Sequence, residues 1–107
     1  MPYMPEPTAE LSREEVDQMS GLVLLEFGAT WCPHCQGAQP ALKAELSNRP
    51  GVKHLKIEDG RGRPLGRSYR VKLWPNLVFL RDGQVLTQLA RPSEAELREA
   101  FKQFDAE

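Results

Sequence analysis

The hydrophobic pattern of this chain alternates between two kinds of segment. Short apolar runs bounded by turn-forming residues are typical of strands, whereas apolar residues that recur every three or four positions are typical of helices. The apolar runs predict strands at 22–27, 52–58, 76–80 and 84–89. The helical patterns predict helices after Ser12 to about 19, from 35 to about 48, at 65–69 and after Ser93.

Capping signals mark the starts of the first and last predicted helices. Ser12 is followed three positions later by Glu15, and Ser93 is followed by Glu96. In such a capping box each side chain bonds the backbone N–H of the other residue, which satisfies amides that a helix start leaves unpaired. Pro40 lies inside the second predicted helix and should kink it, because the apolar period continues beyond a residue that lacks the backbone donor.

The order of these elements predicts an α/β fold in one domain, 1–107. The strand at 22–27 is apolar apart from one glutamate, as expected of a strand that is covered on both faces. A turn at Asp82-Gly83 makes the last two strands antiparallel. We therefore predict a mixed four-stranded sheet with helices on both faces. Three prolines within 1–10 predict an irregular start.

Composition argues against several classes of partner. Fourteen Lys and Arg residues nearly balance fifteen Asp and Glu residues, and the net charge of −1 gives no reason to expect nucleic acid or a membrane surface. The local basic residues are interleaved with glycines and are interpreted as a solvated surface: Arg61, Arg63, Arg67 and Arg70. Residues 1–10 hold no apolar signal-peptide core, so we expect a cytoplasmic protein, or a periplasmic one if a signal peptide was removed.

The two cysteines, Cys32 and Cys35, lie where the second predicted helix starts. Unpaired amides and the helix dipole favour a negative charge at this place, and so favour the thiolate of Cys32. This thiolate can attack a substrate disulfide, and Cys35 can then resolve the mixed disulfide by intramolecular attack. His34, when protonated, would add a positive charge beside the Cys32 sulfur. The cysteine pair carries the electrons itself, so we expect no cofactor and no metal.

Two other interpretations of the cysteine pair are open. The pair could be half of a zinc site, but such a site needs four ligands, and His54 is the one usual partner that remains outside the motif. The cysteines could also be inert core residues that have this spacing by chance.

The segment around the cysteines resembles the active site of the thioredoxin family. Residues 24–35, which include Trp31 directly before Cys32, look like the strand and active-site loop of that family. Pro40 matches the kink in the family's second helix. Segments 71–76 and 81–85 resemble the stretch before its cis-proline and its late hairpin. The resemblance covers nearly the whole chain and implies the same fold and a thiol–disulfide oxidoreductase activity.

The resemblance also implies catalytic roles. Cys32 is similar to the family's exposed nucleophile, Cys35 to its buried resolving thiol, and Pro75 to the cis-proline that packs against the disulfide. Glu26 stands where the family has a buried aspartate, which suggests a proton acceptor for Cys35. Its place in an apolar strand supports burial, which favours the neutral carboxyl. The alternative is that Glu26 pairs with His54 or Lys56 on the neighbouring strand and only balances charge.

Four further residues are implied at the substrate-binding surface: Trp31, Trp74, Asn76 and Arg91. The alternative for Trp31 is that it is a plain core aromatic. The sequence departs from the family's common pattern in the Pro33-His34 dipeptide, which resembles that of periplasmic disulfide oxidases. It also departs at Asn76 and at Arg91, where the family usually has threonine and glycine.

These observations lead to one main prediction and two alternatives. The chain is expected to reduce disulfides of protein substrates as a monomer, with a thioredoxin reductase-like electron donor. The alternatives are a dithiol oxidase or isomerase, since a stabilised thiolate makes the disulfide form more oxidising, and a non-catalytic interaction module that kept the fold.

Overall fold

The computed structural model of the protein describes residue 3 and residues 10–105. Its elements follow the predicted order: α1 (Arg13–Asp17), β1 (Leu22–Gly28), α2 (Pro33–Ser47), β2 (Lys53–Glu58), α3 (Pro64–Ser68), β3 (Asn76–Arg81), β4 (Gln84–Ala90) and α4 (Glu94–Asp105). Within the predicted irregular start, Tyr3 and Glu10 lie in neither helix nor strand. The rest of that prediction concerns residues outside the described ones.

The four strands form one mixed sheet, which confirms the predicted α/β class. Their order is β2-β1-β3-β4, with β1 parallel to β2 and antiparallel to β3, and β3 antiparallel to β4. Every residue of β1 from 23 to 27 is buried, because the sheet is covered on both sides of this strand. The hairpin between β3 and β4 turns through Asp82 and Gly83, both at positive φ, as a tight two-residue hairpin requires.

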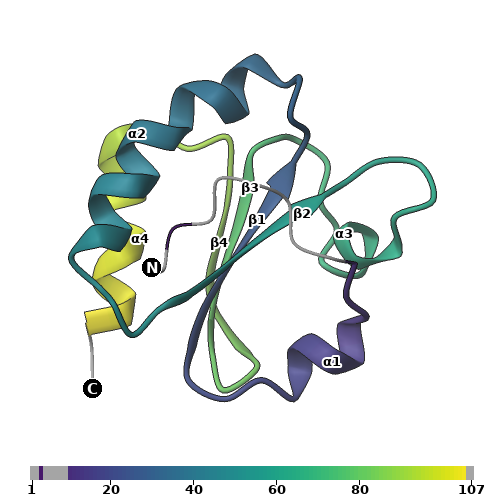
Figure 1. Cartoon of the computed structure of the whole chain (residues 1–107), viewed down its shortest axis with the longest axis horizontal. Helices are drawn as coiled ribbons and strands as arrows, with labels where there is room; N and C mark the ends of the chain where they lie inside the picture. The colour runs from purple at the N-terminus through teal and green to yellow at the C-terminus, as the bar shows by residue number, and fades with distance from the viewer. Residues whose placement is uncertain (1–2, 4–9, 106–107) are drawn as a thin grey trace.

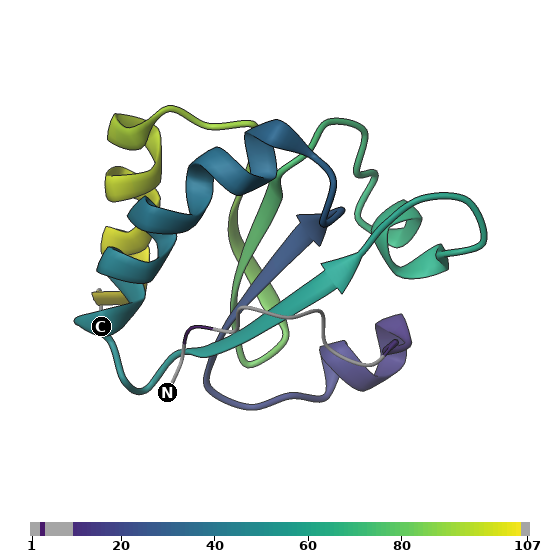
Figure 2. The ribbon, with the colours of Figure 1, turned by 45° about the horizontal axis from the view of Figure 1, so that its top comes forward.

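Helices cover both faces of the sheet, as Figures 1 and 2 show. On one face α1 and α3 contribute Val16 and Leu65 to a core with the odd-numbered residues of β1. On the other face α2 and α4 contribute Leu42 and Phe101 to a second core. The split follows from strand geometry, because successive side chains of β1 point to opposite faces. Glu26 therefore points to the α2 side.

Most element ends lie within two residues of the predicted ones. Both capping boxes are present, with Ser12 and Glu15 bonding each other's backbone and Ser93 and Glu96 doing the same. Helix α1 ends at Asp17, before the predicted end at 19. Helix α2 starts two residues before the predicted start at 35, because proline at its first position needs no partner for a backbone N–H.

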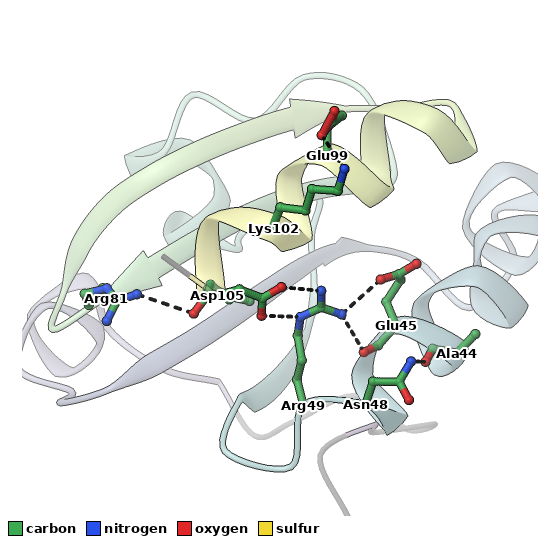
Figure 3. A network of polar contacts seen from close by, with 9 residues as sticks. Ala44, Glu45, Asn48, Arg49, Arg81, Glu99, Lys102 and Asp105 are labelled. Carbon is green, nitrogen blue, oxygen red and sulfur yellow. Dashed lines mark hydrogen bonds and ion pairs between the residues drawn. The ribbon is translucent and has the colours of Figure 1, made fainter. Parts of the chain in front are cut away.

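A polar cluster joins the C-terminal ends of α2 and α4 (Figure 3). Arg49, just after α2, donates to both carboxylate oxygens of Asp105, at 3.0 and 2.9 Å. It also donates to the backbone and side chain of Glu45, at 3.0 Å each. The hydrogen bonds from Arg49 lower the pKa of Asp105. These contacts tie the C-terminal end of α2, which is the end away from the cysteines, to the C-terminal end of α4.

Candidate active site

Four segments of the chain converge at one end of the sheet. Registers place Gly28 opposite Glu58, Phe27 opposite Asn76, and Asn76 opposite Ala90. The ends of β1, β2 and β4 and the start of β3 are therefore neighbours. The loops that carry the cysteines, Asp59, the Trp74-Pro75 peptide and Arg91 all leave the sheet at this end.

The cysteines lie at the start of α2, as the sequence predicts. Cys32 is the N-cap residue, with extended backbone angles, and Pro33 is the first helical residue. The backbone N–H of Cys35 donates to the Cys32 sulfur, with a nitrogen–sulfur distance of 3.2 Å. Both cysteines are free thiols. The Cys32 sulfur thus receives an amide that the helix start leaves without a backbone partner, a contact that favours its thiolate.

The prediction that Cys32 is exposed is wrong. Its exposed fraction is 4%, and that of Cys35 is 3%. Both pack with Ala29 and Trp74 in a small apolar cluster, so a side chain from before β3 covers a sulfur that the local sequence leaves open. The backbone also approaches closely, because a Cβ atom at Gly28 would lie 2.5 Å from the Cys35 sulfur. A larger residue at the end of β1 would therefore displace the Cys35 side chain.

The two thiols differ in electrostatics and not in exposure. Burial raises the pKa of Cys35 to about 12, and the hydrogen bond with Cys32 and the charge of Glu26 add to this effect. Cys35 consequently stays protonated near neutral pH. It needs a proton acceptor before it can act as a nucleophile.

Glu26 is buried, with an exposed fraction of 1%, as predicted. Its two oxygens have different partners. Nε2 of His54 lies 2.8 Å from Oε1, and Nε2 of Gln39 donates to Oε2 at 2.7 Å. His54, one of the two predicted basic partners, is in contact with the carboxylate.

Gln39 connects this carboxylate to the cysteine helix. Its Nε2 also donates to the backbone carbonyl of Cys35 at 2.7 Å. Its Oε1 accepts from Nζ of Lys56 at 3.1 Å and from the hydroxyl of Tyr3 at 2.7 Å. Gln39 was missed in the sequence, although it lies one helical turn after Cys35 and hence on the same face of α2.

A small cavity is bordered by both Glu26 and Cys35. Glu26, Gly28, Ala29, Cys35 and Lys56 are among the residues that line it. The space that water can enter is about 10 Å³, roughly the room that one molecule needs. The Cys35 thiol and the Glu26 carboxylate thus border the same small space.

Two tryptophans flank the cysteines on the outside. Trp31 is 71% exposed, which excludes the alternative that it is a core aromatic. Its ring meets that of Trp74 edge-on, with centroids 5.5 Å apart. Nε1 of Trp74 donates to Oδ2 of Asp59 at 2.9 Å. The Asp59 contact, which nothing in the local sequence indicates, fixes the ring that covers the sulfurs.

The Trp74-Pro75 peptide is cis, as predicted. The backbone N–H of Arg91 donates to the Pro75 carbonyl at 2.8 Å, and Nε of Arg91 donates to the Trp74 carbonyl at 2.9 Å. Arg91 therefore lies at this peptide, in the region where the sequence placed it.

Asn76 and His34 occupy different surroundings. Asn76 is buried, and its Oδ1 accepts from Nε2 of Gln88 at 2.9 Å, so its side chain faces the neighbouring strand, and its role in substrate binding stays a prediction. As the first residue of β3, Asn76 turns its side chain toward the neighbouring strand. His34 is exposed in the first turn of α2.

Within residues 3 and 10–105, no group of three or more Cys, His, Asp or Glu side chains could hold a metal ion. In the same part of the chain, none of the helices has the length and apolarity that crossing a membrane requires. The exposed basic residues near α3 include Arg67 and Arg70, while Arg63 is partly exposed and pairs with Glu10 and Glu58.

Comparison with known proteins identifies the family. The sequence matches the family model described as thioredoxin over residues 6–103. The chain belongs to the thioredoxin family. Membership explains why a cysteine pair at a helix start, a cis-proline and a buried carboxyl meet at one end of a mixed sheet.

Individual thioredoxins resemble the chain over most of its length. Thioredoxin-1 of Caenorhabditis elegans is 30% identical over 78 residues, which cover 73% of this chain and 68% of that protein. The thioredoxin of Chlamydia trachomatis serovar D is 39% identical over 66 residues, 61% of this chain and 64% of that protein. The reduced form of thioredoxin 2 from Pseudomonas aeruginosa PAO1 has a TM-score of 0.82 and 51% identity, and covers 94% of this chain and 96% of its own.

These findings establish the reaction class. The protein is a thiol–disulfide oxidoreductase that uses a dithiol, and proteins of its family act on protein disulfides. The resemblance predicted from the sequence is confirmed.

Proposed function

We propose that this thioredoxin reduces protein disulfides, with Cys32 as the nucleophile and Cys35 as the resolving thiol. The observation that carries the proposal is the asymmetry of the pair. Cys32 accepts an amide hydrogen bond at a helix start, whereas Cys35 has a pKa of about 12 and adjoins a carboxylate through a cavity. Cys32 is placed to attack a substrate disulfide, whereas Cys35 must lose its proton to a base before it can react.

The first step uses the Cys32 thiolate. It attacks one sulfur of the substrate disulfide, so a bond forms between the two sulfurs while the substrate's own S–S bond breaks. The departing substrate sulfur leaves as a thiolate and takes a proton from solvent. The Cys35 amide and the exposed His34 beside it support the negative charge on Cys32 before attack.

The second step uses Cys35. Its thiol gives a proton to Glu26, and the resulting thiolate attacks the Cys32 sulfur. The Cys32–Cys35 disulfide forms, the bond to the substrate breaks, and the second substrate thiol is released. The cycle then requires an electron donor to reduce the disulfide, for which we propose a thioredoxin reductase-like protein.

Docking involves the surface around Trp31 and the Trp74-Pro75 peptide. The exposed Trp31 ring and the partly exposed Trp74 ring provide an apolar platform next to Cys32. We propose that Pro75 lies against the disulfide and that the backbone before it pairs with an extended substrate segment, in the manner of strand addition. A monomer in the cytoplasm fits this role, because that compartment keeps dithiols reduced.

The first prediction tests whether the dithiol turns over as a disulfide reductase. With dithiothreitol as the electron source, the protein should accelerate the reduction of insulin disulfides, and the reduced dithiol should be regenerated in each turnover. The acceleration is measured by the precipitation of the free insulin chain. The matched control is Cys32→Ser, which should give the uncatalysed rate. Equal rates for the two proteins would contradict the role as a reductant and would favour the alternative of a non-catalytic interaction module.

A second prediction concerns His34, which also addresses the oxidase alternative. A protonated imidazole in the first turn of α2 stabilises the thiolate and therefore the reduced form. His34→Ala should make the couple more reducing by on the order of 10–20 mV, because the side chain is exposed and its charge is screened. Equilibration with a glutathione buffer measures this shift.

The matched control is Lys43→Ala, which removes an exposed cation further along α2 and should leave the redox potential unchanged. An unaltered potential in His34→Ala would mean that the helix amides alone stabilise the thiolate.

A further inference from the structure

Arg91 is held against the docking peptide by two contacts. Its backbone N–H donates to the Pro75 carbonyl at 2.8 Å, and its Nε donates to the Trp74 carbonyl at 2.9 Å. The residue therefore contacts the carbonyls of both Trp74 and Pro75. Its position relative to the sulfurs is fixed through Trp74, which packs with Cys32 and Cys35.

The backbone at Arg91 takes a conformation that suits glycine. Its φ is +48°, in the left-handed region that residues with a Cβ adopt at a cost. A glycine would keep the backbone hydrogen bond to Pro75 without that cost. What arginine adds at this position is therefore its side chain alone.

The guanidinium of Arg91 retains most of its hydrogen-bonding capacity. Arginine has five N–H donors, and the contact with Trp74 uses the one on Nε. The side chain is exposed, and none of the carboxylates in residues 3 and 10–105 forms an ion pair with it. The two terminal nitrogens thus present a fixed, uncompensated positive charge. Their paired donors match the two oxygens of a carboxylate.

The other charged groups near this peptide do not offer the same feature. Asp59 is partly buried and accepts from Nε1 of Trp74, and among the described residues no ion pair joins it to Arg91. Lys72 is exposed and lies two residues before Trp74, but it carries a flexible point charge without a fork. His34 lies on the α2 side of the cysteines. Arg91 is the cation that the fold holds in a defined direction at the docking peptide.

We propose that Arg91 selects polypeptide substrates that carry an Asp or Glu side chain next to the disulfide cysteine. The inference rests on the proposed function, since it names the substrate class of the same site. A carboxylate that meets the terminal nitrogens of Arg91 would hold the substrate segment along the Trp74-Pro75 edge. Because the contact stays partly exposed to solvent, we expect a preference of about three- to fivefold in kcat/KM.

The test compares two synthetic peptide disulfides with blocked ends that differ in one residue. One has glutamate next to the cysteine, and the other has glutamine, which has the same shape without the charge. The wild-type protein should reduce the glutamate peptide about three- to fivefold faster in kcat/KM, and added salt should diminish the ratio. In Arg91→Gly the ratio should fall to about one. In Arg91→Lys it should lie between these values, because charge remains while the paired donors are lost.

Two controls make the result specific. Lys72→Gln removes a nearby exposed charge and should keep the wild-type ratio of the two kcat/KM values. An equal fall of this ratio in Lys72→Gln and Arg91→Gly would overturn the proposal, because it would mean that the general positive charge of the surface causes the preference. The thermal unfolding midpoint of Arg91→Gly should not fall, since its backbone angles suit glycine. A ratio near one in the wild type, or an unchanged ratio in Arg91→Gly, would also overturn it. Failure of the proposed function gives a different result, because then neither peptide is reduced.

Discussion

Replacing Cys35 with serine should convert this thioredoxin into a protein that stays covalently bound to its substrate. Cys32 can still attack a disulfide, but the hydroxyl of serine cannot resolve the product, so turnover should fall by about a hundredfold or more. Mixing Cys35→Ser with a peptide disulfide and analysing the products by mass spectrometry without reductant should show one peptide attached at position 32. Cys32→Ser should form little adduct, because the pKa of Cys35 is about 12 and its thiol stays neutral.

Burial alone would not predict this difference, since the exposed fractions of the two cysteines are 4% and 3%. The expected contrast therefore tests the electrostatic explanation directly. Limiting iodoacetamide at neutral pH should label Cys32 of the reduced wild-type protein, and peptide mapping identifies the adduct. Predominant labelling of Cys35, or a stable adduct in Cys32→Ser, would reverse the assigned roles.

The features that the sequence predicts well are those with a local physical cause. The strand at 22–27 is identified by its apolar run, the helix starts by the Ser12 and Ser93 capping boxes, and the β3–β4 turn by Asp82-Gly83. The spacing of the cysteines at a helix start indicates the chemistry for the same reason. Each of these signals depends on a few adjacent residues whose interactions survive in the folded protein.

The features that it predicts poorly depend on side chains from distant segments. Cys32 is buried because Trp74 covers it, and Trp74 is held by Asp59, which follows another strand. The partner of Glu26 shows the same limit. Register places Lys56 opposite Glu26, yet the carboxylate meets His54, and Gln39 of α2 takes the remaining oxygen. These contacts join segments that are distant along the chain, so no local pattern specifies them.

Glu26→Gln should slow the resolving step by about a hundredfold near neutral pH, the effect expected when a positioned general base is lost. With a pKa of about 12, only about one Cys35 thiol in 10⁵ ionises unaided at neutrality. The carboxylate lies across a cavity with room for about one water from this thiol, and it can accept the proton there. Glutamine keeps the shape of the side chain but cannot take up the proton.

The rate deficit of Glu26→Gln in the resolving step should depend on pH, and the raised pKa of Cys35 sets the direction of that dependence. Burial raises the pKa of the Cys35 thiol, so its nucleophilic form is scarce at neutral pH and grows as the pH rises toward about 12. The deficit of Glu26→Gln should therefore shrink in alkaline solution, where the thiol ionises without help. Stopped-flow mixing with an aromatic disulfide measures the two released thiols in turn. The first phase, attack by Cys32, is an internal control and should be similar in both proteins.

The rival interpretation is that Glu26 only pairs with His54 and holds β1 to β2. It predicts a lower unfolding midpoint for Glu26→Gln but an unchanged second phase at every pH, and that result would rule out the role as proton acceptor. His54→Gln is the matched variant, because it retains a donor toward Oε1 while it removes the titratable imidazole. If Glu26 receives the proton of Cys35, this variant should keep most of the resolving rate at neutral pH. A loss in His54→Gln as large as that in Glu26→Gln would instead place the proton acceptor in the pair as a whole.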